Sequence, residues 1–132
     1  VDAHHTVEDT GIVLGQLFAK VLGDKSGIAR FGESMVPMDE SLARAVVDIS
    51  GRPYLVLDAQ PTAGSIGTYD TQLTREFFRA MANGMGGTLH LCVLYGENEH
   101  HRTEALFKAA ARAIAAACAE RAGSVLSAKG VL

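Results

Sequence analysis

One short motif occurs twice in the chain, and this repeat restricts the fold and the chemistry more than any other feature of the sequence. The motif is His-His-X-X-Glu, at residues 4–8 and again at residues 100–104, and it contains four of the five histidines in 132 residues. Each copy begins a segment with helical periodicity, and the second copy directly follows a strand-like segment. The pattern therefore predicts an internal repeat of a strand-helix unit, whose first copy lacks everything before its final helix.

The spacing within each motif predicts a pair of metal ligands on one face of a helix, because residues i and i+4 lie on the same face. The pairs are His4 with Glu8 and His100 with Glu104. The second histidine of each motif points about 100° away around the helix axis. Two metals could be held if each took a His/Glu pair from one motif and the second histidine of the other. Imidazole and carboxylate ligands without thiolate favour Mn, Fe or Zn.

Composition predicts a single globular domain and excludes some partners. The chain is 48% hydrophobic and 20% charged, with a net charge of −3, so it has no basic footprint for nucleic acid or anionic membrane. Its longest apolar stretch, residues 109–119, is alanine-rich and far from the roughly 20 strongly apolar residues of a membrane span. Cys92 and Cys118 are predicted to be buried free thiols, which fits a reducing compartment such as the cytoplasm.

Periodicity predicts the element order α, β, β, β, α, β, α. Helices are expected at about residues 2–22, 71–85 and 99–120, and strands at about residues 31–37, 42–49, 53–58 and 88–95. Ser50-Gly51-Arg52 is predicted to form a hairpin turn between the second and third strands.

Small residues predict close packing at two helices. Gly11 and Gly15 fall on the same helical stripe as the first His/Glu pair, which indicates a close neighbouring element. In the last helix a narrow seam is predicted, formed by Leu106, Ala110, Ala113 and Ala117.

Several motifs in order make the chain resemble the imidazoleglycerol-phosphate dehydratase family. The matching stretches are AHHTVEDT (3–10), GIARFG (27–32), PMDE (37–40), DISGRPY (48–54), residues 98–113 beginning NEHH, and SAKG (127–130). The resemblance implies an α+β fold with a duplicated module like the second domain of ribosomal protein S5, in which a sheet carries two helices on one face. Residues 1–30 would be the end of an incomplete first module, residues 31–123 the second module, and residues 124–132 a tail with a phosphate-binding motif.

The resemblance also implies an activity. The enzyme would be a carbon–oxygen lyase of histidine biosynthesis that dehydrates imidazole glycerol phosphate to imidazole acetol phosphate. It would use two Mn ions per active site, with Fe or Zn possible. Its active sites would lie between the subunits of a homo-oligomer, a 24-mer. The enzyme would be cytoplasmic, or plastid if the chain comes from a plant. One metal would bind His4, Glu8 and His101, and the other would bind His5, His100 and Glu104.

Other roles are carried over from the family by position. Glu76 occupies a position that is often a histidine ligand in the family, and here it could be a carboxylate ligand or a solvated helix residue. Glu8 and Glu104 are the catalytic carboxylates that the chain offers, although both are largely committed as ligands. The substrate phosphate would be bound by Arg30, Arg52, Ser127 and Lys129. His90, between two leucines on a strand, is expected to be a core residue or to support a ligand.

Two features keep other functions open. The chain begins Val1-Asp2-Ala3 without methionine, so we expect a fragment that lacks the family's N-terminal segment, together with one histidine ligand and an acidic residue at the substrate. Such a chain would be a poor dehydratase alone and could be a catalytically incomplete metal-binding assembly domain. A dinuclear metallohydrolase also needs paired His and carboxylate ligands. The phosphate-binding residues favour the dehydratase over the hydrolase.

Overall fold

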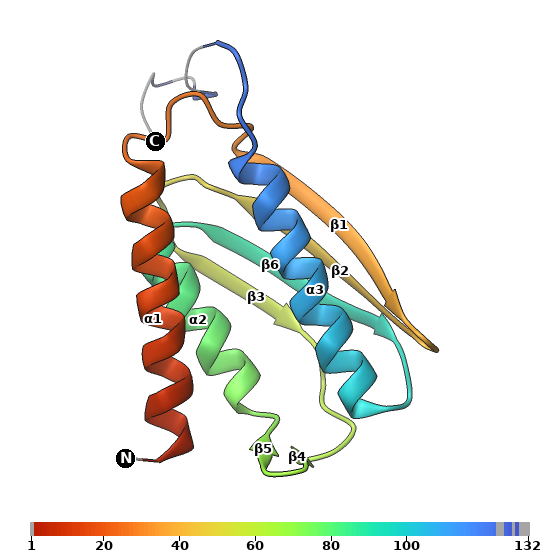
Figure 1. Cartoon of the computed structure of the whole chain (residues 1–132). Coiled ribbons are helices and arrows are strands. Elements are labelled where there is room, and N and C mark those ends of the chain that lie inside the picture. Colours follow the sequence, from red (N-terminus) through yellow and green to blue (C-terminus); the bar gives the residue numbers. More distant parts are fainter. Residues whose placement is uncertain (1, 124–125, 128, 130–132) are drawn as a thin grey trace.

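A computed structural model describes residues 2–123, 126–127 and 129 of the chain (Figure 1). In these residues the helices are α1 (Ala3–Leu22), α2 (Leu73–Met85) and α3 (Glu99–Cys118). The strands are β1 (Phe31–Met38), β2 (Ser41–Asp48), β3 (Tyr54–Asp58), β4 (Ser65–Ile66), β5 (Tyr69–Asp70) and β6 (Thr88–Tyr95). The predicted order is confirmed, with β4 and β5 as an added small hairpin.

The main sheet has the strand order β1-β2-β6-β3. A two-residue turn, Asp39 and Glu40, joins β1 to β2 in an antiparallel hairpin, while β3 pairs with β6 in parallel. The predicted hairpin at Ser50-Gly51-Arg52 is therefore wrong, because β6 lies between β2 and β3. The turn itself is present, since Gly51 has a φ of 75° and Ser50 Oγ accepts a hydrogen bond from Arg52 N at 3.2 Å. Turn residues reverse the chain without determining which strand it pairs with next.

Helices α2 and α3 cover one face of the main sheet, and α1 lies beside α2 (Figure 1). All three helices begin at the same end of the molecule. The predicted seam on α3 is confirmed, because its four residues are buried against the sheet. At Gly32 on β1, an added Cβ would lie only 2.0 Å from the carbonyl oxygen of Ala113. The small residues thus let the backbones of α3 and β1 come into direct contact.

Glycine also holds α1 against α2. An added Cβ at Gly11 would lie 2.5 Å from the carbonyl oxygen of Phe77, and one at Gly15 would lie 2.5 Å from that of Met81. The close neighbour predicted from these glycines is therefore α2. This contact places the first turns of α1 beside the first turns of α2, where Glu76 lies.

Two other predictions need correction or refinement. His90 is exposed on the sheet face opposite α2 and α3, so it is not a core residue; Leu89 and Leu91 take the buried positions because successive side chains alternate along a strand. Cys92 and Cys118 are free, as predicted, but only half-buried, and this burial raises the pKa of both thiols. Among the described residues no helix is both long and apolar enough to cross a membrane.

Candidate metal centre

An acceptor side chain stands just before each His-His-X-X-Glu motif and makes the motif the start of a helix. Asp2 Oδ1 accepts the N–H of His5 at 3.0 Å, and Asn98 Oδ1 accepts the N–H of His101 at 3.2 Å. These caps bind backbone N–H groups that the first helical turn leaves without a partner. Both motifs are therefore helical from their first histidine, as the spacing predicted.

The helical spacing brings the two His/Glu pairs together. His4 Nε2 lies 3.7 Å from Glu8 Oε2, and His100 Nε2 lies 3.0 Å from Glu104 Oε2. In both pairs the histidine side chain is about half-exposed, so an ion could reach the pair from solvent. Each pair presents one imidazole nitrogen and one carboxylate to the same point in space.

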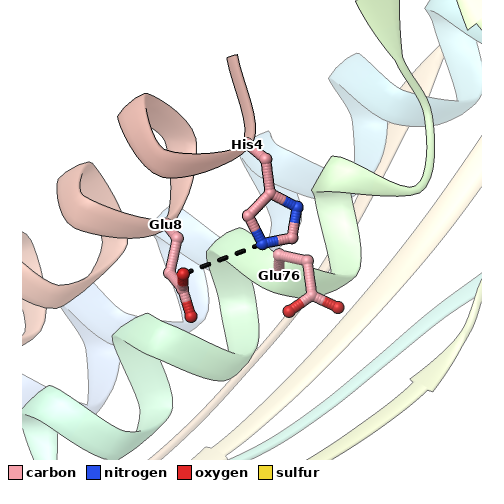
Figure 2. Close-up of side chains that lie close together, drawn as sticks. All are labelled: His4, Glu8 and Glu76. Carbon is pink, nitrogen blue, oxygen red and sulfur yellow. Dashed lines mark ion pairs between the residues drawn. The ribbon is translucent and has the colours of Figure 1, made fainter. Parts of the chain in front are cut away.

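A third ligand candidate joins the first pair. His4, Glu8 and Glu76 each have one atom that could bind a metal, and these three atoms lie within 4.8 Å of one another. Figure 2 shows the three side chains converging from α1 and α2. The Glu76 side chain is only 19% exposed and forms an ion pair with Arg79 one helical turn later. The Glu76 carboxylate therefore lies where a third ligand to the His4/Glu8 pair would be, and it is at the same time paired with Arg79. A mixed imidazole and carboxylate set of this kind suits Mn, Fe or Zn.

The second pair has a different neighbour. Lys108 Nζ lies 2.5 Å from Glu104 Oε1, one turn further along α3, and this hydrogen bond lowers the pKa of Glu104. Among the described residues, no third potential ligand lies as close to His100 and Glu104 as Glu76 does to the first pair. This pair would need a ligand from elsewhere to complete a metal site.

The second histidine of each motif is hydrogen-bonded to a carboxylate through Nδ1. His5 Nδ1 lies 2.7 Å from Asp2 Oδ1, and His101 Nδ1 lies 2.7 Å from Glu40 Oε2. These bonds raise the pKa of both histidines. In each ring the remaining nitrogen, Nε2, is the one left to bind a metal.

Metal affinity is expected to fall on acidification, starting above pH 6.5. The hydrogen bond to Glu40 raises the pKa of His101 above its ordinary value of 6.5, and a protonated imidazole cannot bind a metal. Because the pKa is raised, protons displace the metal at a higher pH than they would from an ordinary histidine. Below that pKa the dissociation constant for Mn should increase about tenfold per pH unit for each proton displaced. Calorimetric Mn titrations between about pH 8.5 and 5.5 measure this slope; an affinity unchanged down to pH 6 would contradict it.

The predicted phosphate-binding residues lie at the other end of the helices. Arg30 has a φ of 70°, and its backbone N–H donates to the carbonyl of Ala117 in the last turn of α3. Its guanidinium donates Nε to Asp48 Oδ1 at 2.7 Å and Nη2 to Oδ2 at 3.2 Å, and Nη1 donates to the carbonyl of Leu126. Arg30 is thus bound on both sides before any phosphate arrives.

The rest of this set lies near Arg30. Arg52 is exposed, and its carbonyl accepts a hydrogen bond from Thr88 Oγ1 at 3.1 Å; Thr88 pairs with Asp48 across the sheet. Ser127 Oγ accepts the N–H of Lys129 at 3.2 Å in the tail. The predicted tail at residues 124–132 otherwise lies outside the described residues.

The metal ligands and the phosphate-binding residues are far apart within one chain. α3 has 20 residues and rises 1.5 Å per residue, so its two ends are about 30 Å apart. His100 lies at its start and Arg30 at its end. A substrate the size of a small sugar phosphate cannot contact both ends of the same chain.

Sequence reasoning assigned no role to several polar residues at this site. Glu40 belongs to the PMDE stretch, but nothing in the sequence shows that it meets His101, which is 61 positions away. Lys108 and Arg79 could have been found, because each stands one turn after an acidic residue on the same helix.

Comparison with known proteins gives a consistent result. The sequence model of imidazoleglycerol-phosphate dehydratase matches residues 1–114. The dehydratases of Lacticaseibacillus casei (strain BL23) and Clostridium botulinum (strain Langeland) are each 57% identical to this chain over 134 residues; the match covers 100% of this chain and 69% or 68% of the relative.

Two solved structures agree in fold. The crystal structure of imidazoleglycerol-phosphate dehydratase from Staphylococcus aureus N315 matches this chain with a TM-score of 0.87 and 48% sequence identity. The match covers 90% of this chain and 70% of the Staphylococcus aureus chain. The crystal structure of the Pyrococcus furiosus protein has a TM-score of 0.89 at 37% identity, over 100% of this chain and 73% of its own. The resemblance seen in the motifs is therefore confirmed by sequence and fold together, and the chain belongs to the imidazoleglycerol-phosphate dehydratase family.

Proposed function

We propose that the protein dehydrates imidazole glycerol phosphate to imidazole acetol phosphate in histidine biosynthesis, using two divalent metal ions per active site. The observation that carries this proposal is the cluster of His4, Glu8 and Glu76, together with the second His/Glu pair of matching geometry on α3. Membership of a dehydratase family favours this reaction over hydrolysis by a dinuclear metal site. Mn is the ion we expect first, and the ligand chemistry also suits Fe or Zn.

Two complementary ligand sets would hold the two metals. His4, Glu8 and Glu76 would hold one ion with His101 from the other motif. His100 and Glu104 would hold the second ion with His5. When bound, the ions supply Lewis acidity and fix the position of the substrate's imidazole ring. The carboxylates of Glu8 and Glu104 would lie near a ring held at these metals, and they are the candidates in this chain for moving its protons.

The phosphate would bind at the other set of residues. Arg30 is held by Asp48, while the guanidinium of Arg52 is exposed and donates Nη1 to the carbonyl of Ser50 at 3.3 Å. The Nε and Nη2 edge of Arg52 would form the fork with phosphate oxygens. Ser127 and Lys129 would add a hydroxyl and an ammonium group. All four remain predictions, supported by their common position at one end of the fold.

The distance between these two ends supports sites shared between subunits. Because one chain cannot bring its own His100 and Arg30 to a single substrate, each active site would combine the metal-binding end of one subunit with the phosphate-binding end of another. A closed homo-oligomer, such as the 24-mer implied by the family resemblance, would satisfy this requirement. We expect the assembly in the cytoplasm and each subunit to contain the duplicated module, with residues 31–123 as its second copy.

Subunit mixing tests the shared site directly. The variants His100→Ala and Arg30→Ala should each be inactive alone, because every site of a pure variant lacks either a metal ligand or a phosphate ligand. Co-assembly in equal amounts should restore about a quarter of the wild-type activity, since each site draws the two residues independently from different subunits. Formation of imidazole acetol phosphate is the measurement.

Two controls sharpen this test. A mixture of His100→Ala with Glu104→Ala, which both affect the same pair, should stay inactive. If the first mixture also stayed inactive although both variants assemble, the shared-site proposal would be wrong. Wild-type protein that binds Mn but does not turn over substrate, even when it carries the N-terminal segment of the family, would support the alternative of a metal-binding assembly domain.

A further inference from the structure

Glu40 has an unusual set of hydrogen-bond partners for a turn residue. It lies in the two-residue turn between β1 and β2, next to Asp39, whose φ is 47°. Its Oε1 accepts hydrogen bonds from the backbone N–H of Glu97 at 3.0 Å, from that of Asn98 at 2.8 Å, and from the Ser41 hydroxyl at 3.0 Å. The carboxylate therefore ties the turn to the residues that begin α3.

The other oxygen of Glu40 faces the imidazole of His101. The distance from Glu40 Oε2 to His101 Nδ1 is 2.7 Å, and the His101 side chain is 25% exposed. A carboxylate can only accept a hydrogen bond, so Nδ1 must carry the proton in the neutral ring. Nε2 then has the free lone pair that a metal ligand needs.

We propose that Glu40 is a positioning residue that holds His101 in its Nδ1–H tautomer with Nε2 available to a divalent metal. The relevant contacts join the β1–β2 turn, the loop before α3 and the motif itself, so the ring is fixed in orientation as well as in tautomer. Partners of this kind around metal-binding histidines raise metal affinity typically 10- to 100-fold. The inference rests on the proposed function, because it assumes that His101 binds metal.

Asp39 meets the same ring on its other side and provides a matched control. Its Oδ2 lies 3.6 Å from His101 Nε2, and its side chain is 73% exposed. This contact would favour a proton on Nε2, opposite to the effect of Glu40. The contact of His101 with Glu40 is the shorter of the two, and three further hydrogen-bond donors hold the Glu40 carboxylate in place. Glu40 therefore determines the tautomer.

A glutamine at position 40 is expected to reverse the tautomer. In Glu40→Gln the amide carbonyl should stay with the three donors at the Oε1 position, which leaves the NH₂ group facing His101 Nδ1. Because NH₂ donates, Nδ1 must become the acceptor, and the proton moves to Nε2. In Glu40→Ala no group forces either tautomer, and water can accept from Nδ1.

These two variants give an order of affinities that a purely structural role would not. We expect Mn affinity to fall about 10- to 100-fold in Glu40→Gln and by less in Glu40→Ala, although glutamine is the more conservative change. Both variants remove one negative charge, so charge alone predicts equal losses. Loss of structure predicts the larger effect for alanine. Either of these two results would overturn the proposal.

The tautomer itself is measured without metal. The ¹⁵N spectra of histidine-labelled, metal-free protein, at a pH where His101 is neutral, should show Nδ1–H in the wild type and in Asp39→Asn, and Nε2–H in Glu40→Gln. The signal is assigned by its absence in His101→Gln. A wild-type Nε2–H signal would overturn the proposal. Wild-type protein with Nδ1–H but no Mn binding would instead overturn the proposed function and leave the orientation of His101 supported.

Discussion

Replacing His100 or His4 by alanine is expected to remove bound metal from the protein. Each variant leaves a single glutamate where the helix now presents an imidazole and a carboxylate together. Residues that only support a ligand typically change metal affinity 10- to 100-fold, so loss of a direct ligand should exceed about 100-fold. Elemental analysis after extensive dialysis should show at least one ion per site missing from each variant, and both ions missing from the double variant.

The fifth histidine of the chain is the control for this experiment. His90 is exposed on β6 and belongs to neither motif, so His90→Ala should keep the wild-type metal content. Unchanged metal content in both His4→Ala and His100→Ala would show that the motifs do not bind metal. Equal losses in all three variants would point to nonspecific imidazole binding.

The second large effect is expected from Gly15→Ala, which adds a methyl group where α1 touches α2. The new Cβ would lie 2.5 Å from the carbonyl oxygen of Met81 and 2.8 Å from the backbone nitrogen of Met85, and neither atom can move without shifting the helix. Overpacking of this kind costs about 3 kcal/mol, against a gain of about 1 kcal/mol in helix propensity. The free energy of unfolding should therefore fall by about 2 kcal/mol.

The same change should also weaken metal binding, because it forces α1 away from α2 and separates His4 and Glu8 from Glu76. Denaturant unfolding of metal-free protein and Mn titration measure the two effects. Gly64→Ala is the matched control, since no atom lies within 4 Å of an added Cβ there and the change should alter stability by less than about 0.5 kcal/mol. If Gly15→Ala were as stable as the wild type, the backbones of α1 and α2 could not be in direct contact at this position.

Local patterns predicted the elements of this fold well, and long-range pairing poorly. The order of helices and strands follows from periodicity, and β6 was predicted with its observed bounds. The failure at Ser50-Gly51-Arg52 has a clear cause: the turn is real, but β6 enters the sheet between the two strands that it joins. The choice of strand partner depends on burial of the whole sheet, which no short stretch of sequence contains.

At the metal centre, too, local contacts could be predicted from the sequence and long-range contacts could not. The pairs His4–Glu8 and His100–Glu104 are helical neighbours, so their spacing alone predicts them. The approach of Glu76 depends on the packing of α1 against α2, for which the glycines of α1 were the only sequence signal. The contact of Glu40 with His101 depends on where a turn lies relative to a helix from a distant part of the chain, and no periodicity could reveal it.

The separation between the two ends of α3 also has a consequence for ligand discovery. A compound that binds one isolated chain can engage the imidazole-rich end or the arginine-rich end, and the length of the helix prevents a drug-sized molecule from reaching both. Fragments found separately at these ends should not be linked by measuring the gap within a single subunit. If the proposed shared site holds, the useful geometry is the one between neighbouring protomers, and screening and design should start from the assembled particle.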